Sequence, residues 1–181
     1  QLAPTALGKP ILYAGKEVVI HLTCKDLNRN ALESEAWLLH SEGFNNILAM
    51  TGDYPVAGNG GTAKPVFDID SVGLISMLQQ MNEGLDPNGV RGGPRARFER
   101  TSFLTGAAIA NFKLREGEVM PQYFKLQAKI AAGARFIINQ IGFDARKQHE
   151  QHAYMAAHGM GGTPLIGNVY LLSPRVAGLF H

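Results

Sequence analysis

The sequence has one cysteine, Cys24, among 181 residues, and it has no apolar run long enough to cross a membrane. A single cysteine excludes an internal disulfide and fits a reducing compartment, so we expect a cytoplasmic protein. A membrane helix needs about 18 consecutive apolar residues, and the first residues lack the basic start and apolar core of an export signal. We therefore expect neither a membrane-spanning nor an exported protein.

An excess of charge of one sign is also absent. The chain has 17 basic and 15 acidic residues, and its formal net charge of +2 is too small to indicate nucleic-acid binding. Four arginines crowd the stretch RGGPRARFER (91–100), which lacks the interleaved aromatic side chains of a base-stacking surface, so we expect a solvated loop or an anion contact. With 45% hydrophobic and 18% charged residues, the chain is expected to form one soluble domain, residues 1–181.

What the sequence does contain is a regular alternation of apolar, β-rich runs with longer segments of helical spacing. The predicted strands are 17–24, 45–51, 105–112, 134–140 and 164–172, and the predicted helices are 29–43, 70–84, 121–133 and 144–159. Asp70 is the expected N-cap of the second helix, and Pro121 is expected to start the third. Strict alternation predicts parallel strands joined by right-handed crossovers, in either an open doubly wound sheet or a closed barrel.

Polar side chains stand at or near the carboxyl ends of these predicted strands: His21, Thr23, Asp53, Asn111, Gln140, Asn168 and Tyr170. Parallel α/β proteins place their chemistry at this edge, so we expect the polar ends to meet at one mouth. The alternative is that such residues simply mark where each strand leaves the core. Gln140 and Asn168 lie within or near apolar runs, where an amide buried without hydrogen bonds is penalised.

Asp53 is the most unusual of these residues, because a carboxylate here follows the apolar run ILAMT and Gly52. A carboxylate at the tip of a buried strand is costly unless it has a partner or a use. A long connection, 54–69, follows it, and a second one spans 85–104; loops of such length are usually functional or mobile. The GNGG in the first loop lacks the spacing of a phosphate-binding motif, which favours a flexible loop.

The remaining reactive side chains predict little chemistry. His149 and His152 share one helical face, with His158 further along, but a zinc site needs more ligands within reach, so we expect an exposed polar face and no metal. Cys24 is expected to be a small core residue rather than a nucleophile. No nucleophile elbow is present, which argues against covalent hydrolysis.

Five stretches together resemble methylenetetrahydrofolate reductase, over about residues 17–173. They are HLTCKDLNRNAL (21–32), NNILAMTGDYP (45–55), GAAIANFK (106–113), FKLQAKIAAGARFIINQIGFD (124–144) and LIGNVYLLS (165–173). The resemblance implies a (β/α)8 TIM barrel, of which this chain matches the third to seventh strands. The first two strands and the last are not evident, nor is the acidic glutamate that the family carries on its first strand.

The barrel is therefore expected to be incomplete. We expect a fragment of a longer protein, a chain with segments hidden by the continuous numbering, or a subunit completed by another chain. By itself the polypeptide is then expected to be inactive, since five strands would leave sheet edges open.

The resemblance also implies an activity: the FAD-dependent reduction of 5,10-methylenetetrahydrofolate to 5-methyltetrahydrofolate in one-carbon and methionine metabolism. NADH or NADPH is the implied electron donor, either directly or through an electron-transfer subunit, and an oligomer is expected. Asp53 and Gln140 are the implied catalytic and substrate-binding residues. Asp53 would lie between flavin and folate, while Gln140 would contact the pterin and, in the other half-reaction, the nicotinamide.

The remaining flavin contacts implied by the resemblance are His21, Gly52 and Lys129, the last holding the pyrophosphate. An ordinary surface lysine is the alternative for Lys129. Thr51, Ile109 and Lys113 also fall at cofactor-binding positions, but they depart from the family pattern: Thr51 replaces an arginine, Ile109 replaces a tyrosine that stacks on the flavin in some members, and Lys113 falls near a histidine position. Asn111 or Lys113 is expected to replace the flavin contacts that are lost at these positions.

Two other functions stay open. A folate- or flavin-binding subunit of a methyl-transfer complex, without its own catalysis, would explain the missing glutamate. A third possibility keeps the barrel but transfers methyl groups in a corrinoid or demethylation pathway.

Overall fold

A computed structural model describes residues 2–56, 58–85, 98–168, 170 and 173. The helices are α1 (Pro4–Tyr13), α2 (Arg29–Ser41), α3 (Ser71–Glu83), α4 (Glu116–Ala131) and α5 (Ala145–Ala157), with a 3-10 turn η1 at Gly58–Gly61. The strands are β1 (Val19–Thr23), β2 (Asn46–Met50), β3 (Leu104–Ile109), β4 (Phe136–Asn139) and β5 (Leu165–Ile166). Every predicted strand and helix is therefore present, and α1 is additional.

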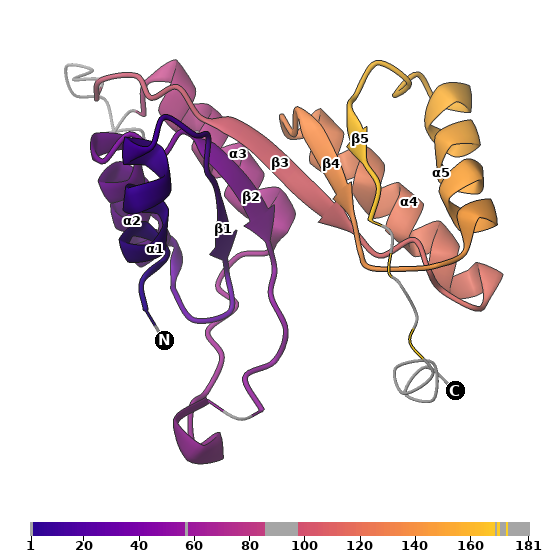
Figure 1. Cartoon of the computed structure of the whole chain (residues 1–181), viewed down its shortest axis with the longest axis horizontal. Coiled ribbons are helices and arrows are strands. Elements are labelled where there is room, and N and C mark those ends of the chain that lie inside the picture. The colour runs from indigo at the N-terminus through magenta and orange to yellow at the C-terminus, as the bar shows by residue number, and fades with distance from the viewer. Residues whose placement is uncertain (1, 57, 86–97, 169, 171–172, 174–181) are drawn as a thin grey trace, which may run out of the picture.

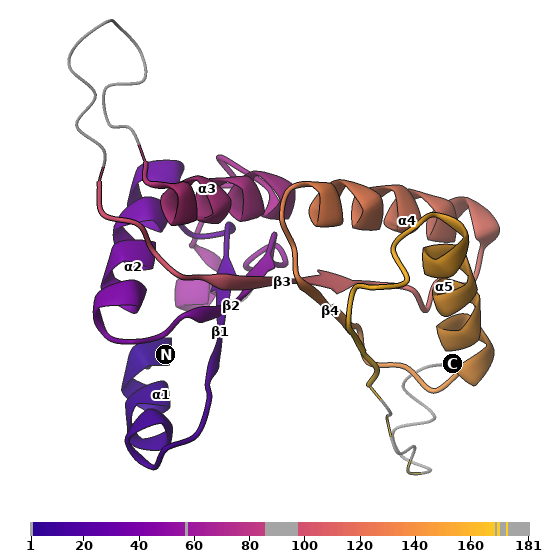
Figure 2. The same ribbon diagram turned by 90° about the horizontal axis from the view of Figure 1, so that it is seen from above.

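The sheet is parallel throughout, and its spatial order is β1-β2-β3-β4-β5, the same as the order along the chain. A doubly wound sheet reverses its order at one point, whereas an unbroken order with right-handed crossovers puts every helix on one face. Figure 2 shows this arrangement, with the five helices forming an arc around the convex side of the sheet. The fold is thus the predicted α/β barrel type, and among the described residues the barrel is not closed.

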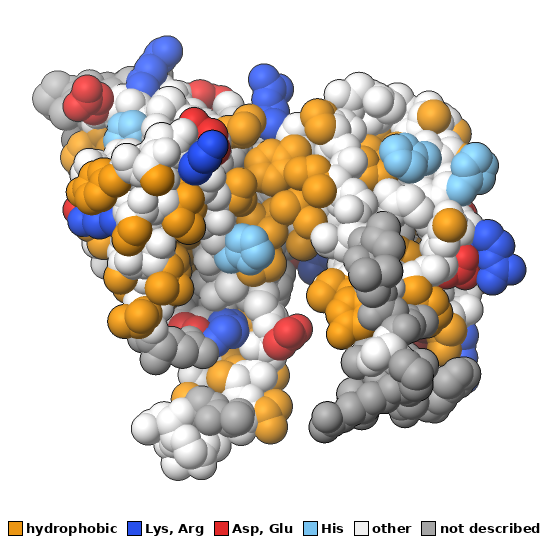
Figure 3. Space-filling model, viewed as in Figure 1, with side chains coloured by type: hydrophobic (Ala, Val, Ile, Leu, Met, Phe, Trp, Pro, Cys, Tyr) orange, Lys and Arg blue, Asp and Glu red, His pale blue; other side chains and the backbone are white. Residues whose placement is uncertain are grey.

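The two faces of the sheet differ in burial because side chains alternate along each strand. The face toward the helices carries the hydrophobic core, including Ile20, Ile47, Ala107 and Ile137. The opposite, concave face exposes apolar side chains, and Val19, Leu104 and Ile166 there are 41%, 47% and 49% exposed. Figure 3 looks onto this face and shows hydrophobic side chains gathered at its centre.

Side-chain caps fix where three helices begin. The Asp70 carboxylate accepts hydrogen bonds from the backbone N–H groups of Val72 and Gly73, both at 3.0 Å, which confirms the predicted cap of α3. Asn28 caps α2 and Asp144 caps α5 in the same way. Because each helix follows a strand, these capped ends stand at the carboxyl edge of the sheet.

Three expectations about element boundaries are corrected. α4 begins at Glu116 rather than Pro121, which lies in its second turn, and two acidic residues in the first turn, Glu116 and Glu118, favour the earlier start. Gly8 and Pro10 disfavour a helix, so α1 was not predicted from the sequence. A Cβ at Gly8 would lie 2.7 Å from the Phe44 ring, so glycine permits close packing there. β5 is only two residues long, and residues 169, 171 and 172 of the predicted strand lie outside the described part.

Two further expectations concern the arginine cluster and membrane-spanning helices. Residues 86–97, which hold three of the four clustered arginines, lie outside the described part of the chain. No helix among the described residues is both long and apolar enough to cross a membrane.

Candidate active site

The carboxyl ends of all five strands lie along one edge of the sheet, which is the lower edge in Figure 1. Asp53 and Gln140 both belong to this edge, because they follow β2 and β4, the two neighbours of β3. The Asp53 side chain is exposed, and its carboxylate makes no hydrogen bond or ion pair with another described residue. The two predicted catalytic residues are therefore brought to the same edge of one sheet.

Gln140 extends β4 by one residue, since its backbone N–H donates to the Ile109 carbonyl at 2.8 Å. Its side-chain Oε1 accepts from the N–H of Ile141 at 3.0 Å, which holds the amide in place. Gln140 follows Ile138 by two residues and so shares the concave face with it. The residue is exposed rather than buried, so the concern about an unpaired buried amide does not apply to it.

Next to this edge, the concave face is lined by rows of residues in register across the strands. The first row contains Thr23, Met50, Ala108, Ile138 and Ile166, and the second contains His21, Leu48, Gly106 and Phe136. His21 is exposed on the concave face, the same face as Gln140. The Phe136 ring covers Gly106, where a Cβ would lie 2.2 Å from the ring. The site thus has an apolar floor bordered by polar groups.

Thr51 and Gly52 shape the turn that presents Asp53. The Thr51 Oγ1 accepts from the Ser71 N–H at 3.1 Å and donates to the Ser71 Oγ at 3.2 Å, which ties the end of β2 to the start of α3. Gly52 has a φ of +85°, a left-handed conformation that favours glycine, and a Cβ there would lie 3.1 Å from the Lys25 side chain. Thr51 therefore faces the helix layer and positions the turn.

Lys129 is not an ordinary surface lysine, so that alternative is wrong. Its side chain is half-buried, and its ammonium donates to the Ala108 carbonyl on β3 at 2.6 Å. Burial is the main reason that its pKa falls to about 8. The positive charge of the nearby Lys125 lowers the pKa further, whereas the negative charge of Asp70 raises it. Lys125 itself lies 3.5 Å from the Asp70 carboxylate. A desolvated ammonium without a paired carboxylate is suited to an anionic ligand.

Two predicted flavin contacts lie elsewhere. Ile109 is 3% exposed and belongs to the core between sheet and helices, since it alternates with Ala108 on the concave face. Asn111 is fully buried and donates to the Lys147 carbonyl of α5 at 3.5 Å, so it packs under α5. Lys113, by contrast, is exposed in the connection to α4.

The sequence reasoning missed a buried polar cluster between α5 and strands β3 and β4. Asn139 is 2% exposed and donates to Gln148, while it accepts at its backbone carbonyl from the half-buried Asn168. Asn139 and Gln140 are adjacent, so the alternation of side chains along a strand requires one of them to face the helices. The sequence could therefore have predicted a buried amide at one of these two positions. Gln151 is fully buried as well, and its Oε1 has no described partner.

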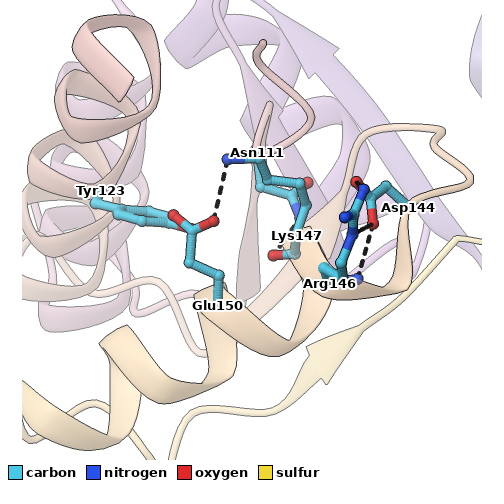
Figure 4. A network of polar contacts seen from close by, with 6 residues as sticks. All are labelled: Asn111, Tyr123, Asp144, Arg146, Lys147 and Glu150. Carbon is cyan, nitrogen blue, oxygen red and sulfur yellow. Dashed lines mark hydrogen bonds and ion pairs between the residues drawn. The ribbon is translucent and has the colours of Figure 1, made fainter. Parts of the chain in front are cut away.

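A second set of polar contacts lies beside this cluster (Figure 4). Glu150 accepts from the Tyr123 hydroxyl at 3.2 Å and pairs with the Lys147 ammonium at 3.0 Å. Burial, with the Glu150 charge second, raises the pKa of Tyr123 well above its usual range. These contacts fasten α5 to α4 on the helix side of the sheet.

The other reactive side chains that the sequence analysis considered are Cys24 and the three histidines of the last helical segment. Cys24 is fully buried, and burial, with the nearby Asp70 charge second, raises the pKa of its thiol to about 11, which confirms a core residue. His149, His152 and His158 are exposed. The described part of the chain holds no group of three His, Cys, Asp or Glu side chains that could bind a metal.

Comparison with known proteins identifies the family. No curated protein sequence matches the chain. Among solved structures, a putative phosphonomutase from Burkholderia cenocepacia J2315 matches with a TM-score of 0.47 and 17% sequence identity, over 99% of this chain and 66% of that one. The family model described as methylenetetrahydrofolate reductase matches residues 12–174. Since that match includes all the strands and the whole carboxyl edge, the chain belongs to the methylenetetrahydrofolate reductase family.

Proposed function

We propose that this protein is a flavin-dependent oxidoreductase that reduces 5,10-methylenetetrahydrofolate to 5-methyltetrahydrofolate. One observation carries the proposal: the exposed Asp53 carboxylate, which pairs with no other described residue, shares a sheet edge with the Gln140 amide beside an apolar concave face. Family membership supports a folate reductase in general terms. The specific reaction is the one that the resemblance implies, and the chemistry of these side chains is suited to it.

The chain offers groups that fit FAD. Met50, Ala108 and Ile138 provide an apolar surface for a flat ring system, and His21 adds a polar group on the same face. Lys129 provides a cation for the anionic pyrophosphate, for which its lowered pKa and single carbonyl partner are suitable. When bound, the flavin supplies the hydride chemistry, taking reducing equivalents from NADH, NADPH or an electron-transfer subunit.

Asp53 has the charge that the folate half-reaction needs. Opening the methylene bridge of the substrate produces a cationic iminium group, which a fixed carboxylate stabilises in a site from which water is excluded. No salt bridge to a described residue competes for the carboxylate. Asp53 therefore acts on developing positive charge, while Gly52 sets its position.

Gln140 is suited to two alternating ligands. Its amide contributes donors and an acceptor, so it can hydrogen-bond to the pterin ring in one half-reaction and to the nicotinamide carboxamide in the other. Its backbone bond to Ile109 keeps it in register with β3. Its role is to orient each ligand in turn.

One observation favours a second candidate, a folate- or flavin-binding subunit without its own catalysis. Four other aspartates near this edge are engaged: Asp26 with Lys25, Asp68 with Arg29, and Asp70 and Asp144 as helix caps. None of the four is available to protonate the folate during bridge opening. The catalytic proposal therefore requires a proton donor beyond these residues.

Anaerobic absorption spectroscopy of the purified protein separates the candidates. The reductase is expected to bind FAD, to lose its visible flavin absorbance with NADH or NADPH, and to regain it when methylenetetrahydrofolate is added. Recovery of flavin absorbance with no loss of folate substrate would contradict the reductase. A protein that binds flavin but leaves it oxidised with both donors and with dithionite-reduced ferredoxin supports the non-catalytic subunit.

A further inference from the structure

The outer face of α2 forms one wall of a groove of about 530 Å³, which we call the α2 groove. Asn30, Glu33, Ser34 and Trp37 line it from α2, at positions that fall on one stripe of the helix. Phe98 and Glu99 line it from the segment that leads into β3. The groove belongs to the helix layer and is separate from the concave face where Asp53 and Gln140 act.

The Phe98–Glu99 wall is fixed to the end of α3. The Phe98 N–H donates to the Leu85 carbonyl at 3.0 Å, and the Thr101 N–H donates to the Met81 carbonyl at 3.2 Å. Asn82 adds three bonds, accepting from the Phe103 N–H at 2.7 Å and the Thr101 hydroxyl at 2.8 Å and donating to the Phe103 carbonyl at 2.9 Å. The end of α3 therefore holds in place the segment that lines the groove opposite α2.

Two aromatic side chains that line the groove contact each other. The rings of Trp37 and Phe98 meet edge to face, with centroids 5.8 Å apart and an interplanar angle of 67°. Trp37 is half-buried and Phe98 is 46% exposed, so both rings retain accessible surface. Exposed aromatic faces attract cations, and guanidinium groups stack on them most readily.

The charges in the groove are carboxylates on opposite walls, Glu33 from α2 and Glu99 from the β3 side. Neither carboxylate makes a hydrogen bond or ion pair with another residue in the described part of the chain. Two carboxylates in the lining of a groove that also contains a tryptophan ring match the flat fork of donors of a guanidinium better than the compact ammonium of lysine.

We propose that the α2 groove binds an arginine side chain of a partner protein. The guanidinium stacks on Trp37 and donates to Glu33 and Glu99, while the Asn30 and Ser34 side chains offer hydrogen bonds to the partner's backbone. Tryptophan with buried charge pairs is typical of the few residues that dominate binding energy at protein interfaces. This interaction is independent of the folate chemistry proposed above.

Trp37 is the only tryptophan in the chain, so its indole N–H gives one NMR signal that reports on the groove alone. We would titrate the protein with acetyl-Gly-Arg-Gly-amide and with the peptide that has uncharged, nearly isosteric citrulline. The arginine peptide is expected to shift the indole signal saturably and to bind at least about fivefold more tightly than the citrulline peptide. Equal binding of the two peptides, or an unmoved indole signal, would overturn the proposal.

Variants test whether the groove is the binding site, and free arginine tests whether the natural ligand is a protein. Glu33→Gln and Glu99→Gln are each expected to weaken arginine-peptide binding and to leave citrulline-peptide binding unchanged. Glu35→Gln, on the same helix but outside the groove, removes the same charge and should have no effect. Free arginine binding as tightly as the peptide would contradict a protein partner, and the wild-type titrations decide the proposal even if a variant fails to fold.

Discussion

At the scale of single residues, the proposed role of Lys129 predicts that FAD binding depends on pH. In the chain without ligand its pKa is about 8, chiefly because of burial. If Lys129 holds the pyrophosphate, its protonated form binds the anion, and binding would raise the pKa. Affinity for FAD is therefore expected to be constant below about pH 8 and to fall as the pH rises above it.

The measurement is FAD affinity by fluorescence quenching between pH 6.5 and 9.5. Lys129→Gln should bind FAD more weakly at pH 7 and lose most of the decline above pH 8. Lys16→Gln, which changes an exposed lysine before β1, should keep the wild-type profile. An unchanged profile in the Lys129 variant would remove this residue from the cofactor site.

Gln151 provides a second residue-scale prediction. The side chain is fully buried, its Oε1 has no described partner, and its Nε2 lies 4.0 Å from the Met155 sulfur. Replacing a poorly paired buried amide with an apolar group of similar size removes a desolvation cost. Gln151→Met is therefore expected to raise the free energy of unfolding by about 1 kcal/mol, measured with urea.

Gln148→Met is the matched control on the same helix. Gln148 accepts a hydrogen bond from the buried Asn139, so its loss should lower the free energy of unfolding by about 1–2 kcal/mol. A destabilised Gln151→Met variant would show that the amide is paired in solution, for example with an internal water.

At the scale of elements, the sequence predicted the order and type of every strand and four of the helices, because periodicity and caps such as Asp70 act locally. It misplaced what depends on tertiary contacts. α1 forms despite Gly8 because Phe44 packs onto that glycine. Ile109 was assigned to the cofactor by resemblance, and Asn111 was expected at the mouth also as a polar strand end. Alternation along β3 instead places Ile109 in the core, and α5 covers Asn111.

Asn82 is the element-scale contact with the clearest consequence. Its side chain pairs with both the N–H and the carbonyl of Phe103, as a neighbouring strand would, and it also accepts from Thr101. Asn82→Ala is expected to lower the free energy of unfolding by about 2–3 kcal/mol, because it leaves part-buried backbone groups unpaired. Asn82→Asp retains the acceptor but sets a second oxygen against the Phe103 carbonyl, so it should also be destabilised; wild-type stability of either variant in urea denaturation would contradict this role of Asn82.

At the scale of the whole molecule, a sequential parallel sheet brings residues from distant parts of the sequence to one edge. Asp53 and Gln140 are 87 positions apart in the numbering, yet only β3 separates the strands that carry them. The sequence indicated this convergence through the strand–helix alternation. It could not indicate which side chains would be free at that edge, because pairing such as that of Asp68 with Arg29 depends on how the loops fold.

Stopped-flow absorbance follows the two half-reactions of the flavin separately in the Asp53→Asn variant. If Asp53 stabilises the cationic folate, reoxidation of the flavin by methylenetetrahydrofolate should slow by about 10²–10³-fold, while its reduction by the nicotinamide donor should change less than about tenfold. Equal slowing of both half-reactions, or an unchanged rate with folate, would contradict the role of Asp53 and with it the proposed active edge.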